Sequence, residues 1–493
     1  MKLLTLILLI TVACTFNPNM SSAQLDAFLK SGSFRGYFSP GQFWSFVRSM
    51  KSVGAYSNLI TERESLGMTD KGNHVYGFYV CSDASRINEL KTTKNILYMT
   101  GLHHSREPLT VTMIVLMVIN MLKGFTVPGH NHIKALLRDN VIFFVPLVNI
   151  DSYTYMNKMD RLGRATEQVM MIRKNRNVNP QCGALRGGVD LNRNYDFKFG
   201  MDESGSSSNP CAEDYRGPAP FSEKETLAIK TYVDAHPNIV SCVNIHTYGN
   251  DWIYPFNYVN DHGDKYLKTT KPLFFDFFKE FEHECKTKNR KSHFGNSASL
   301  LDYPTNGEAG DWFTGAKNIL NLDVELGNPD KKSDTFYPPR HLLPKIVRFN
   351  YIIMNDFLRK HIVDFDLSHI MMSYGHVPTV IFEIVNKSIS SLKNAELHFR
   401  PVFANDEQVD SKISYVHKEL PSMKGPKRSV KNDVVHETFK GRYTMEIDVT
   451  FDNEAAMNKL IGLEMKIKRK EDSYFGYPDQ RFMFKLKPHP QNK

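Results

Sequence analysis

Two residues that could bind a metal, His104 and Glu107, stand three positions apart in the segment His104-Ser105-Arg106-Glu107. A turn with this spacing can direct an imidazole and a carboxylate at the same zinc ion. Such pairs also arise often by chance. Taken alone, the segment is therefore better explained as a surface ion pair that involves Arg106.

His246, at the end of the apolar run 239–245, is a third candidate ligand. Ligands bind at strand ends in open α/β sheets, which favours this position. Two ligands close in sequence and a distant third would leave the fourth zinc position for water, as catalysis requires. The alternative is a histidine with satisfied hydrogen bonds at a strand terminus, and these residues alone leave it open.

The elements that must position these residues follow from alternating apolar and amphipathic segments between about residues 37 and 360. Ser39, Pro40 and Gln42 have the pattern of an N-cap, a first-turn proline and a capping box, so a helix begins there. Short apolar runs predict strands at 75–80, 95–100, 141–145 and 239–245. Longer apolar or periodic segments predict helices at 108–122 and 342–358. The pattern predicts an α/β fold with a mixed, largely buried sheet and helices on both faces.

Period-two alternation dominates beyond residue 361 and predicts a second, β-rich domain at 363–493. Apolar and polar residues alternate in four runs, at 380–384, 443–451, 463–467 and 482–486. An all-β, sandwich-like domain is the simplest architecture for such strands.

The N-terminal segment has the pattern of a secretory signal. Lys2 precedes the apolar run 3–12, and small residues at 21–23 provide a cleavage site before Gln24. The run is too short to span a bilayer, so we expect a signal peptide at 1–23, a catalytic domain at 24–362 and secretion of the protein. The alternative is an uncleaved anchor.

Composition narrows the class of protein further. The 493-residue chain is 41% hydrophobic and 23% charged, which is typical of globular proteins, and its net charge is +9. Only the N-terminal apolar run approaches membrane character, and no Lys/Arg tract indicates nucleic-acid binding. We therefore expect no membrane span in the mature chain and no nucleic-acid partner.

Eight motifs follow one another in order between about residues 37 and 360. They are the segments 104–107, 145–151, 173–176, 188–195, 215–218 and 246–248, Tyr303 with 311–312, and 324–326. In this order they resemble the secreted zinc metallocarboxypeptidases of the carboxypeptidase A/B and carboxypeptidase T type. So many ordered motifs are far beyond chance.

The resemblance implies one zinc ion per chain, held by His104, Glu107 and His246. It implies that Glu325 is the general base that takes a proton from the zinc-bound water. Partial desolvation in its short apolar strand would raise the pKa of this carboxyl toward the working range. It also implies that Arg173 stabilises the developing oxyanion.

The resemblance further implies a grip on the free C-terminus of a peptide. A guanidinium can hold a carboxylate with two hydrogen bonds, so Arg193 with Asn192 would bind it, and Tyr303 would fold over the substrate. Arg106 would lie further from the bound C-terminus, although a structural ion pair would also explain this residue. The expected partners are peptide or protein C-termini.

The cysteines that would remain after signal cleavage number five, at 81, 182, 211, 242 and 285. In an oxidising compartment they allow at most two disulfide bonds and leave one thiol. The resemblance implies that Cys182 pairs with Cys211 around the Asn192-Arg193 loop. We expect Cys242 to be a buried free thiol beneath the site.

Side-chain preference depends on the specificity pocket. By the resemblance, Gly310 occupies its floor, where relatives place an apolar residue or an acid. Asp323 stands two residues before Glu325, so both side chains share one face of the strand and Asp323 should face the pocket. With Glu308 nearby, this predicts a basic or mixed preference. The alternative is that Asp323 pairs with a protein cation and the pocket also accepts large apolar residues.

Three functions compete. The first is a zinc exopeptidase that releases single C-terminal amino acids. The second is a related zinc amidohydrolase that acts on acylated amino acids or cell-wall peptides, and the third is an inactive binding homologue. The presence of all the expected ligands and of Glu325 argues against the third, and the expected carboxylate grip favours the first over the second.

Overall fold

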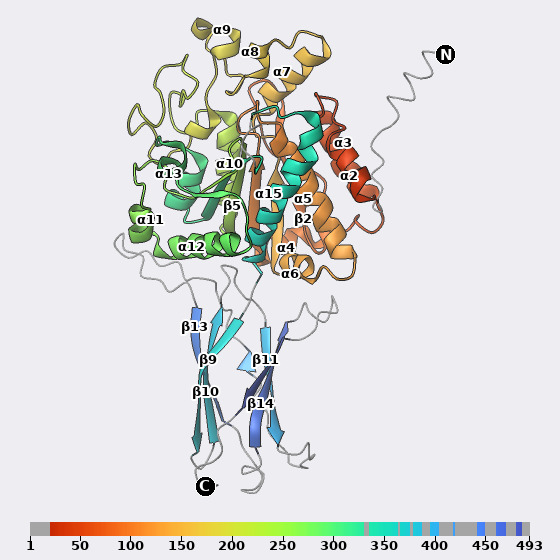
Figure 1. Ribbon diagram of the computed structural model, residues 1–493, viewed down its shortest axis with the longest axis vertical. Helices are drawn as coiled ribbons and strands as arrows, with labels where there is room; N and C mark the ends of the chain where they lie inside the picture. Colours follow the sequence, from red (N-terminus) through yellow and green to blue (C-terminus); the bar gives the residue numbers. More distant parts are fainter. Residues whose placement is uncertain are drawn as a thin grey trace. The chain divides into compact units, whose positions relative to one another are not determined.

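The computed structural model describes residues 20–329 and 335–362 and, beyond them, seven strands (Figure 1). The chain divides into two compact units, residues 1–359 and 360–493. The first unit carries every residue for which the sequence predicts a chemical role.

An eight-stranded mixed sheet forms the centre of the first unit. The strands lie in the order β1-β2-β4-β3-β5-β8-β6-β7. Their bounds are β1 (Glu64–Met68), β2 (His74–Val80), β3 (Asn95–Gly101), β4 (Asn140–Val145), β5 (Ile239–Thr247), β6 (Asp251–Ile253), β7 (His293–Gly295) and β8 (Leu320–Leu326). The neighbours β4, β3, β5 and β8 run parallel, whereas β1, β2 and β6 join by antiparallel pairing. The predicted mixed sheet is confirmed.

The central strands are covered on both faces, which explains their continuous apolar sequences. Every residue of β3 and β4 is buried. On one face, Tyr98 and Phe143 join a core cluster with α10 (Lys224–Ala235) and the adjacent aromatic pair Trp312 and Phe313. The helix α5 (Leu109–Thr126) packs against β2, β3 and β5, and α15 (Leu343–Arg359) packs on α5.

The helix α3 (Pro40–Ser52) begins as predicted. The Ser39 hydroxyl accepts a hydrogen bond from the Gln42 amide, and the Gln42 side chain accepts one from the Ser39 amide. The other α-helices of four or more residues in this unit are α2 (Ser22–Leu29), α4 (Ile87–Thr93), α6 (Asn131–Asp139), α7 (Ile150–Arg161), α8 (Glu167–Met170), α9 (Gly183–Arg186), α11 (Lys265–Thr270), α12 (Pro272–Thr287) and α13 (Ser297–Leu301). Shorter turns that carry site residues are η3 (Leu191–Arg193) and α14 (Ala309–Asp311).

The helix α5 is the one helix within the described ranges that is long and apolar enough to cross a membrane. By hydropathy, the expectation that only the N-terminal run approaches membrane character is therefore wrong. In the structure, 78% of this segment is buried inside the unit. Such all-round hydrophobic burial is characteristic of a core helix in a large domain.

The second unit contains two sets of paired strands. One sheet consists of β9 (Phe365–Tyr374), β10 (Pro378–Asn386) and β13 (Gly441–Asp448), and the other of β11 (Ala395–Phe403), β12 (Lys418–Glu419), β14 (Leu460–Arg469) and β15 (Gln480–Lys485). The four alternating runs fall on β10, β13, β14 and β15. Residues 449–451 and 486 of these runs lie outside the described residues, and the sandwich packing stays a prediction.

Candidate active site

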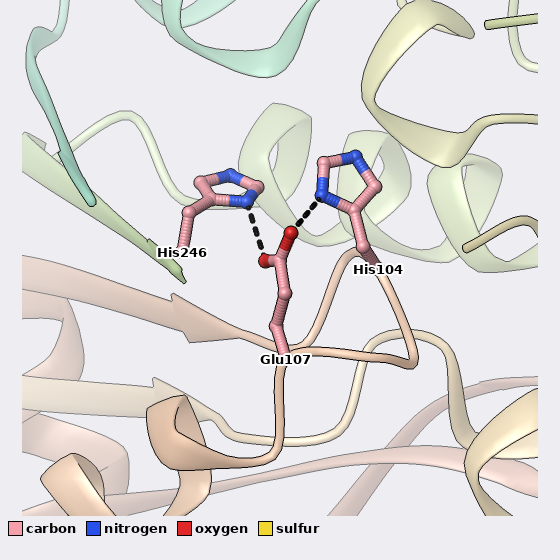
Figure 2. Close-up of side chains that lie close together, drawn as sticks. All are labelled: His104, Glu107 and His246. Atoms are coloured by element: carbon pink, nitrogen blue, oxygen red, sulfur yellow. Dashed lines mark hydrogen bonds and ion pairs between the residues drawn. The ribbon is translucent and has the colours of Figure 1, made fainter. Parts of the chain in front are cut away.

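The three predicted zinc ligands converge at the carboxyl ends of two parallel strands (Figure 2). His104 and Glu107 lie in the turn between β3 and α5, and His246 is the next-to-last residue of β5. His104 Nδ1 lies 2.7 Å from one carboxylate oxygen of Glu107, and His246 Nδ1 lies 3.1 Å from the other. Adjacent parallel strands thus bring together residues far apart in sequence.

These three residues, called the donor set below, have the chemistry of a catalytic zinc site. One donor atom from each lies within 4.8 Å of the others, and all three residues are buried. Two imidazoles and one carboxylate are a known ligand set for catalytic zinc. Burial would raise the pKa of Glu107, but the two imidazoles outweigh burial and hold this pKa far below its ordinary value. The carboxyl is therefore kept in the ionised form that binds a metal.

Asp190 supports the donor set from behind, a role that the sequence analysis missed. Its Oδ1 lies 3.2 Å from His104 Nε2, and its Oδ2 accepts a 2.9 Å hydrogen bond from Arg173 Nε. Despite burial, Arg173 and His104 hold the pKa of Asp190 well below its ordinary value. A carboxylate on the far nitrogen of a ligating histidine fixes the tautomer that presents its other nitrogen to the metal. Asp190 lies in the motif 188–195, but sequence cannot show that it reaches His104.

Glu325 faces the same site from β8, in register with His246 on the neighbouring strand β5. One carboxylate oxygen, Oε2, is buried without a hydrogen-bond partner. Burial raises the pKa of Glu325 well above its ordinary value, and the nearby charges of Glu107 and Asp251 raise it further. The direction of this shift agrees with the expectation for a general base.

A pocket of about 440 Å³, including its open mouth, joins these groups. It is lined by His104, Arg173, Asn192, Arg193, His246, Ile253, Asn257, Ser297, Leu301, Tyr303, Thr305, Glu308, Asp323 and Glu325. Most of the predicted substrate-binding residues are therefore in one cavity. Arg106 and Gly310 do not line it.

Arg193 presents unused donors to the pocket. It ends the turn η3, in which Asp190 accepts a hydrogen bond from the Asn192 amide. Arg193 Nη1 donates to the Asn192 carbonyl, while Arg193 Nε is buried without a partner. Asn192 Oδ1 accepts a 3.0 Å hydrogen bond from the Ala309 amide, which ties the turn to α14. The guanidinium is thus held in place with donors available for an anion.

Tyr303 stands at the rim of the pocket, two residues after α13. Its side chain is 49% exposed, and its carbonyl accepts a hydrogen bond from the Ser297 hydroxyl. This half-exposed phenol lines the same pocket as the buried Arg193.

Arg106 lies outside the pocket, in the ion pair that the sequence analysis left open as an alternative. Its Nη1 is 3.2 Å from Glu213 Oε2, and its guanidinium stacks 4.4 Å from the ring centroid of Phe336. The ring of Phe336 in turn contacts Tyr248. These residues form a separate surface next to the site.

Gly310, which the resemblance places at the floor of the specificity pocket, is not among the residues that line the pocket. A Cβ at this position would lie 2.3 Å from Asp323 Oδ2, so the glycine leaves room for that carboxyl. Asp323 itself lines the pocket, as predicted. Asn244 donates a 2.7 Å hydrogen bond to Oδ1 of Asp323, and Oδ2 is buried without a partner. The alternative pairing of Asp323 with a protein cation is wrong for the described residues.

Glu308 lines the same pocket from the N-terminus of α14. Its oxygens accept hydrogen bonds of 2.6 Å from Asn257 and 2.9 Å from Thr305. Burial raises the pKa of Glu308, and burial together with the Glu308 charge raises the pKa of Asp323 to about 8. The supporting role of Asn257 has no signal in the sequence, because it depends on a contact between residues 51 positions apart.

The cysteine predictions are confirmed. Cys182 and Cys211 form a disulfide bond, and Cys242 is a buried free thiol on β5. The disulfide closes the chain segment that contains Asp190, Asn192 and Arg193. In the chain-entropy model such a bond stabilises the fold by roughly 3 kcal/mol.

The chain is similar in sequence to known carboxypeptidases. The chain is 31% identical over 210 residues to mast cell carboxypeptidase A of Rattus norvegicus, which covers 42% of this chain and 45% of the relative. It is 28% identical over 273 residues to carboxypeptidase B of Rattus norvegicus, covering 55% of this chain and 59% of the relative. The chain thus spans about half the length of these relatives.

Solved structures share the fold. The crystal structure of thrombin activatable fibrinolysis inhibitor matches 71% of this chain and 78% of its own, with a TM-score of 0.55 and 20% identity. Carboxypeptidase A from Helicoverpa armigera matches 68% of this chain and 79% of its own, with a TM-score of 0.51 and 21% identity. The zinc carboxypeptidase family model matches residues 47–352, more than half of the chain. With a donor set that fits its metal, the chain belongs to the zinc carboxypeptidase family.

Proposed function

We propose that this protein is a secreted zinc exopeptidase that hydrolyses the C-terminal peptide bond and releases single amino acids. The observation that carries the proposal is one pocket that joins the donor set, an unpartnered Glu325 oxygen and an Arg193 guanidinium with unused donors. These are a metal site, a base and an anion grip within reach of one substrate terminus.

His104, Glu107 and His246 would hold the zinc ion. When bound there, zinc lowers the pKa of a water molecule and polarises the scissile carbonyl. Asp190 would keep the His104 imidazole in the tautomer that this requires, because its Oδ1, 3.2 Å from Nε2, can accept a proton held there.

Glu325 moves the proton. Its Oε2 accepts a proton from the water as the water oxygen bonds to the scissile carbonyl carbon. When the C–N bond breaks, the same oxygen returns the proton to the leaving amine. Burial suits both steps, because a raised pKa brings the proton affinity of the carboxyl closer to that of the groups it serves.

Arg173 would stabilise the oxyanion. Asp190 binds its Nε and Nη2, at 2.9 and 2.8 Å, so the orientation of the guanidinium is fixed before substrate binds. Preorganised donors of this kind stabilise developing negative charge without reorganisation. Arg173 also lines the pocket, which gives it access to the reacting carbonyl.

Arg193 would make the enzyme an exopeptidase. Its buried, partly unpaired guanidinium requires an anion, and a peptide C-terminus supplies one. Tyr303 at the rim would close over that terminus. A peptide with an amidated end would leave Arg193 buried without its counter-charge.

The acids Glu308 and Asp323 support a basic or mixed side-chain preference. The N-terminal pattern and the Cys182–Cys211 bond support secretion, because disulfides persist in oxidising compartments. The carboxylate grip would also fit acylated amino acids, so the test must separate these substrates.

The test uses N-blocked dipeptides, the same dipeptides with amidated ends, and N-acetyl amino acids, with purified full-length protein. We expect release of free amino acids from the first group only, loss of activity on chelation and recovery on adding zinc. Hydrolysis of N-acetyl amino acids in preference to dipeptides would favour the amidohydrolase. Full activity after chelation would contradict the proposal.

A further inference from the structure

We propose that Glu308 and Asp323, together called the acid pair, form a two-carboxyl receptor for one guanidinium group, so that the pocket selects C-terminal arginine. This inference rests on the proposed carboxypeptidase function and specifies its substrate. It assigns a specificity role to Glu308 that is equal to that of Asp323.

Glu308 is held rigidly in the pocket wall. Asn257 and Thr305 donate one hydrogen bond to each of its oxygens. Asp311, directly behind it, accepts hydrogen bonds from the backbone amides of Asn257 and Tyr258 and so fixes the segment that carries Asn257. Each carboxylate oxygen has two lone pairs, so Glu308 can accept further hydrogen bonds from a ligand.

Asp323 is held with equal precision on β8. Asn244 donates to Oδ1, and the buried Oδ2 has no partner. The absence of a side chain at Gly310 leaves the space that Oδ2 requires. An unpartnered buried carboxylate oxygen is costly unless a ligand supplies a donor.

No ion pair joins the acid pair to a protein cation in the described part of the chain, although the charge of Arg193 is felt by Glu308. The two arginines that line the pocket are occupied elsewhere, because Arg173 pairs with Asp190 and Arg193 is the expected partner of the substrate carboxylate. Two neighbouring buried carboxyls without an ion-pair partner hold their protons more tightly than usual, and a cation bound between them would let both ionise. This favours a substrate that brings its own positive charge.

A guanidinium fits two carboxyls better than an ammonium does. It has five N–H donors in a planar fork and is more weakly hydrated, so it can bind two acceptors on different walls at lower desolvation cost. Ile253 and Leu301 also line the pocket and can cover an aliphatic stem. A lysine ammonium is a compact point charge that can pair with the free Asp323 oxygen without bridging to Glu308.

The test compares kcat/KM for N-blocked dipeptides that end in Arg, Lys and Phe, using zinc-loaded full-length protein. Wild type should favour Arg over Lys, and Lys over Phe. Glu308→Gln should lower the Arg/Phe ratio by about tenfold or more and bring the Arg/Lys ratio close to one. Asp323→Asn should lower both the Arg/Phe and Lys/Phe ratios. The control, Asp302→Asn, removes an exposed acid next to Tyr303 and should leave all ratios unchanged.

A second measurement needs no variant. Inhibition of the wild-type enzyme on the Phe substrate is compared for n-propylguanidine and n-butylamine, which differ in the cationic group. Stronger inhibition by the guanidine supports the receptor. Equal inhibition by both, or an Arg/Phe ratio that Glu308→Gln leaves unchanged, overturns it. If the enzyme releases Phe as fast as Arg, only this inference fails; if it releases no amino acid, the proposed function fails.

Discussion

The donor set and the acid pair both bury carboxyl groups at the same end of the central sheet, yet they leave them in opposite states. Glu107 lies between two imidazoles, and its pKa falls far below the ordinary value. Asp323 has only neutral amides as partners, so burial and the Glu308 charge raise its pKa to about 8. Partners rather than burial decide the charge of each acid, since both are almost fully buried.

This difference separates two tasks in one pocket. An acid that stays ionised at neutral pH can hold a metal, whereas an acid that can hold a proton responds to the charge of the ligand. The chemistry and the selection of substrate are thus assigned to different carboxyls. Changes to the donor set should stop all turnover, whereas changes to the acid pair should only alter which substrates are preferred.

The largest effect is expected for the donor set. Replacing His104, Glu107 or His246 with Ala should reduce hydrolysis of every substrate to background, because the metal is lost. Zinc content by elemental analysis, together with kcat/KM, checks this. The control His262→Ala removes an exposed histidine and should keep full zinc and activity. Retention of stoichiometric zinc and turnover by the ligand variants would contradict the assignment.

Glu325→Gln should separate chemistry from metal binding. The variant loses the proton acceptor but keeps the donor set, so zinc content should stay at wild-type level while kcat falls by about 10²–10⁴-fold. KM should change little, since the substrate grip is intact. A variant that keeps most of its kcat would show that another group carries the proton.

Arg193 lines the same pocket but belongs to neither the donor set nor the acid pair, and it should affect all free C-termini alike. Arg193→Ala should lower kcat/KM for free-ended dipeptides by roughly a hundredfold, as expected for loss of a charge-assisted bidentate hydrogen bond. Amidated dipeptides, already poor substrates, should change little. An equal loss on both kinds of substrate would remove the carboxylate-binding role.

The smallest effect is expected from pH acting on the acid pair. Because the pKa of Asp323 is about 8, this carboxyl is largely protonated at pH 6 and largely ionised at pH 9. Only the ionised form attracts a cation, so the Arg/Phe ratio should rise by severalfold with pH over this range. The arginine side chain stays protonated throughout. Asp323→Asn should flatten the profile; an unchanged slope would assign the titration to another group.

Much of the fold could be predicted from the sequence. The strands β2–β5 and the helices α5 and α15 are long and apolar or strongly periodic, and their predicted positions match the structure to within a few residues. The edge strands β6 and β7 have three residues each and carry no readable period. The half-exposed β1 was missed for the same reason.

Site residues that belong to recognisable motifs could be proposed from the sequence. Residues whose role depends on contacts between distant segments could not. His104, Glu107, His246 and Glu325 converge as expected. Asp190 was not assigned a role, because its bonds to His104 and Arg173 join segments that are distant in sequence. The resemblance pointed to Gly310 for the pocket floor, but sequence spacing could not show that the Asp323 carboxyl fills the space beside this glycine.

The central claim is that a zinc ion in the donor set drives removal of single residues from free C-termini. The most direct measurement is mass spectrometry over time of an unmodified peptide incubated with the wild-type, chelated and zinc-restored protein. We predict a ladder of products that each lack one further C-terminal residue, absent after chelation and restored by zinc. Internal fragments, or a ladder that persists in the chelated protein, would contradict the claim.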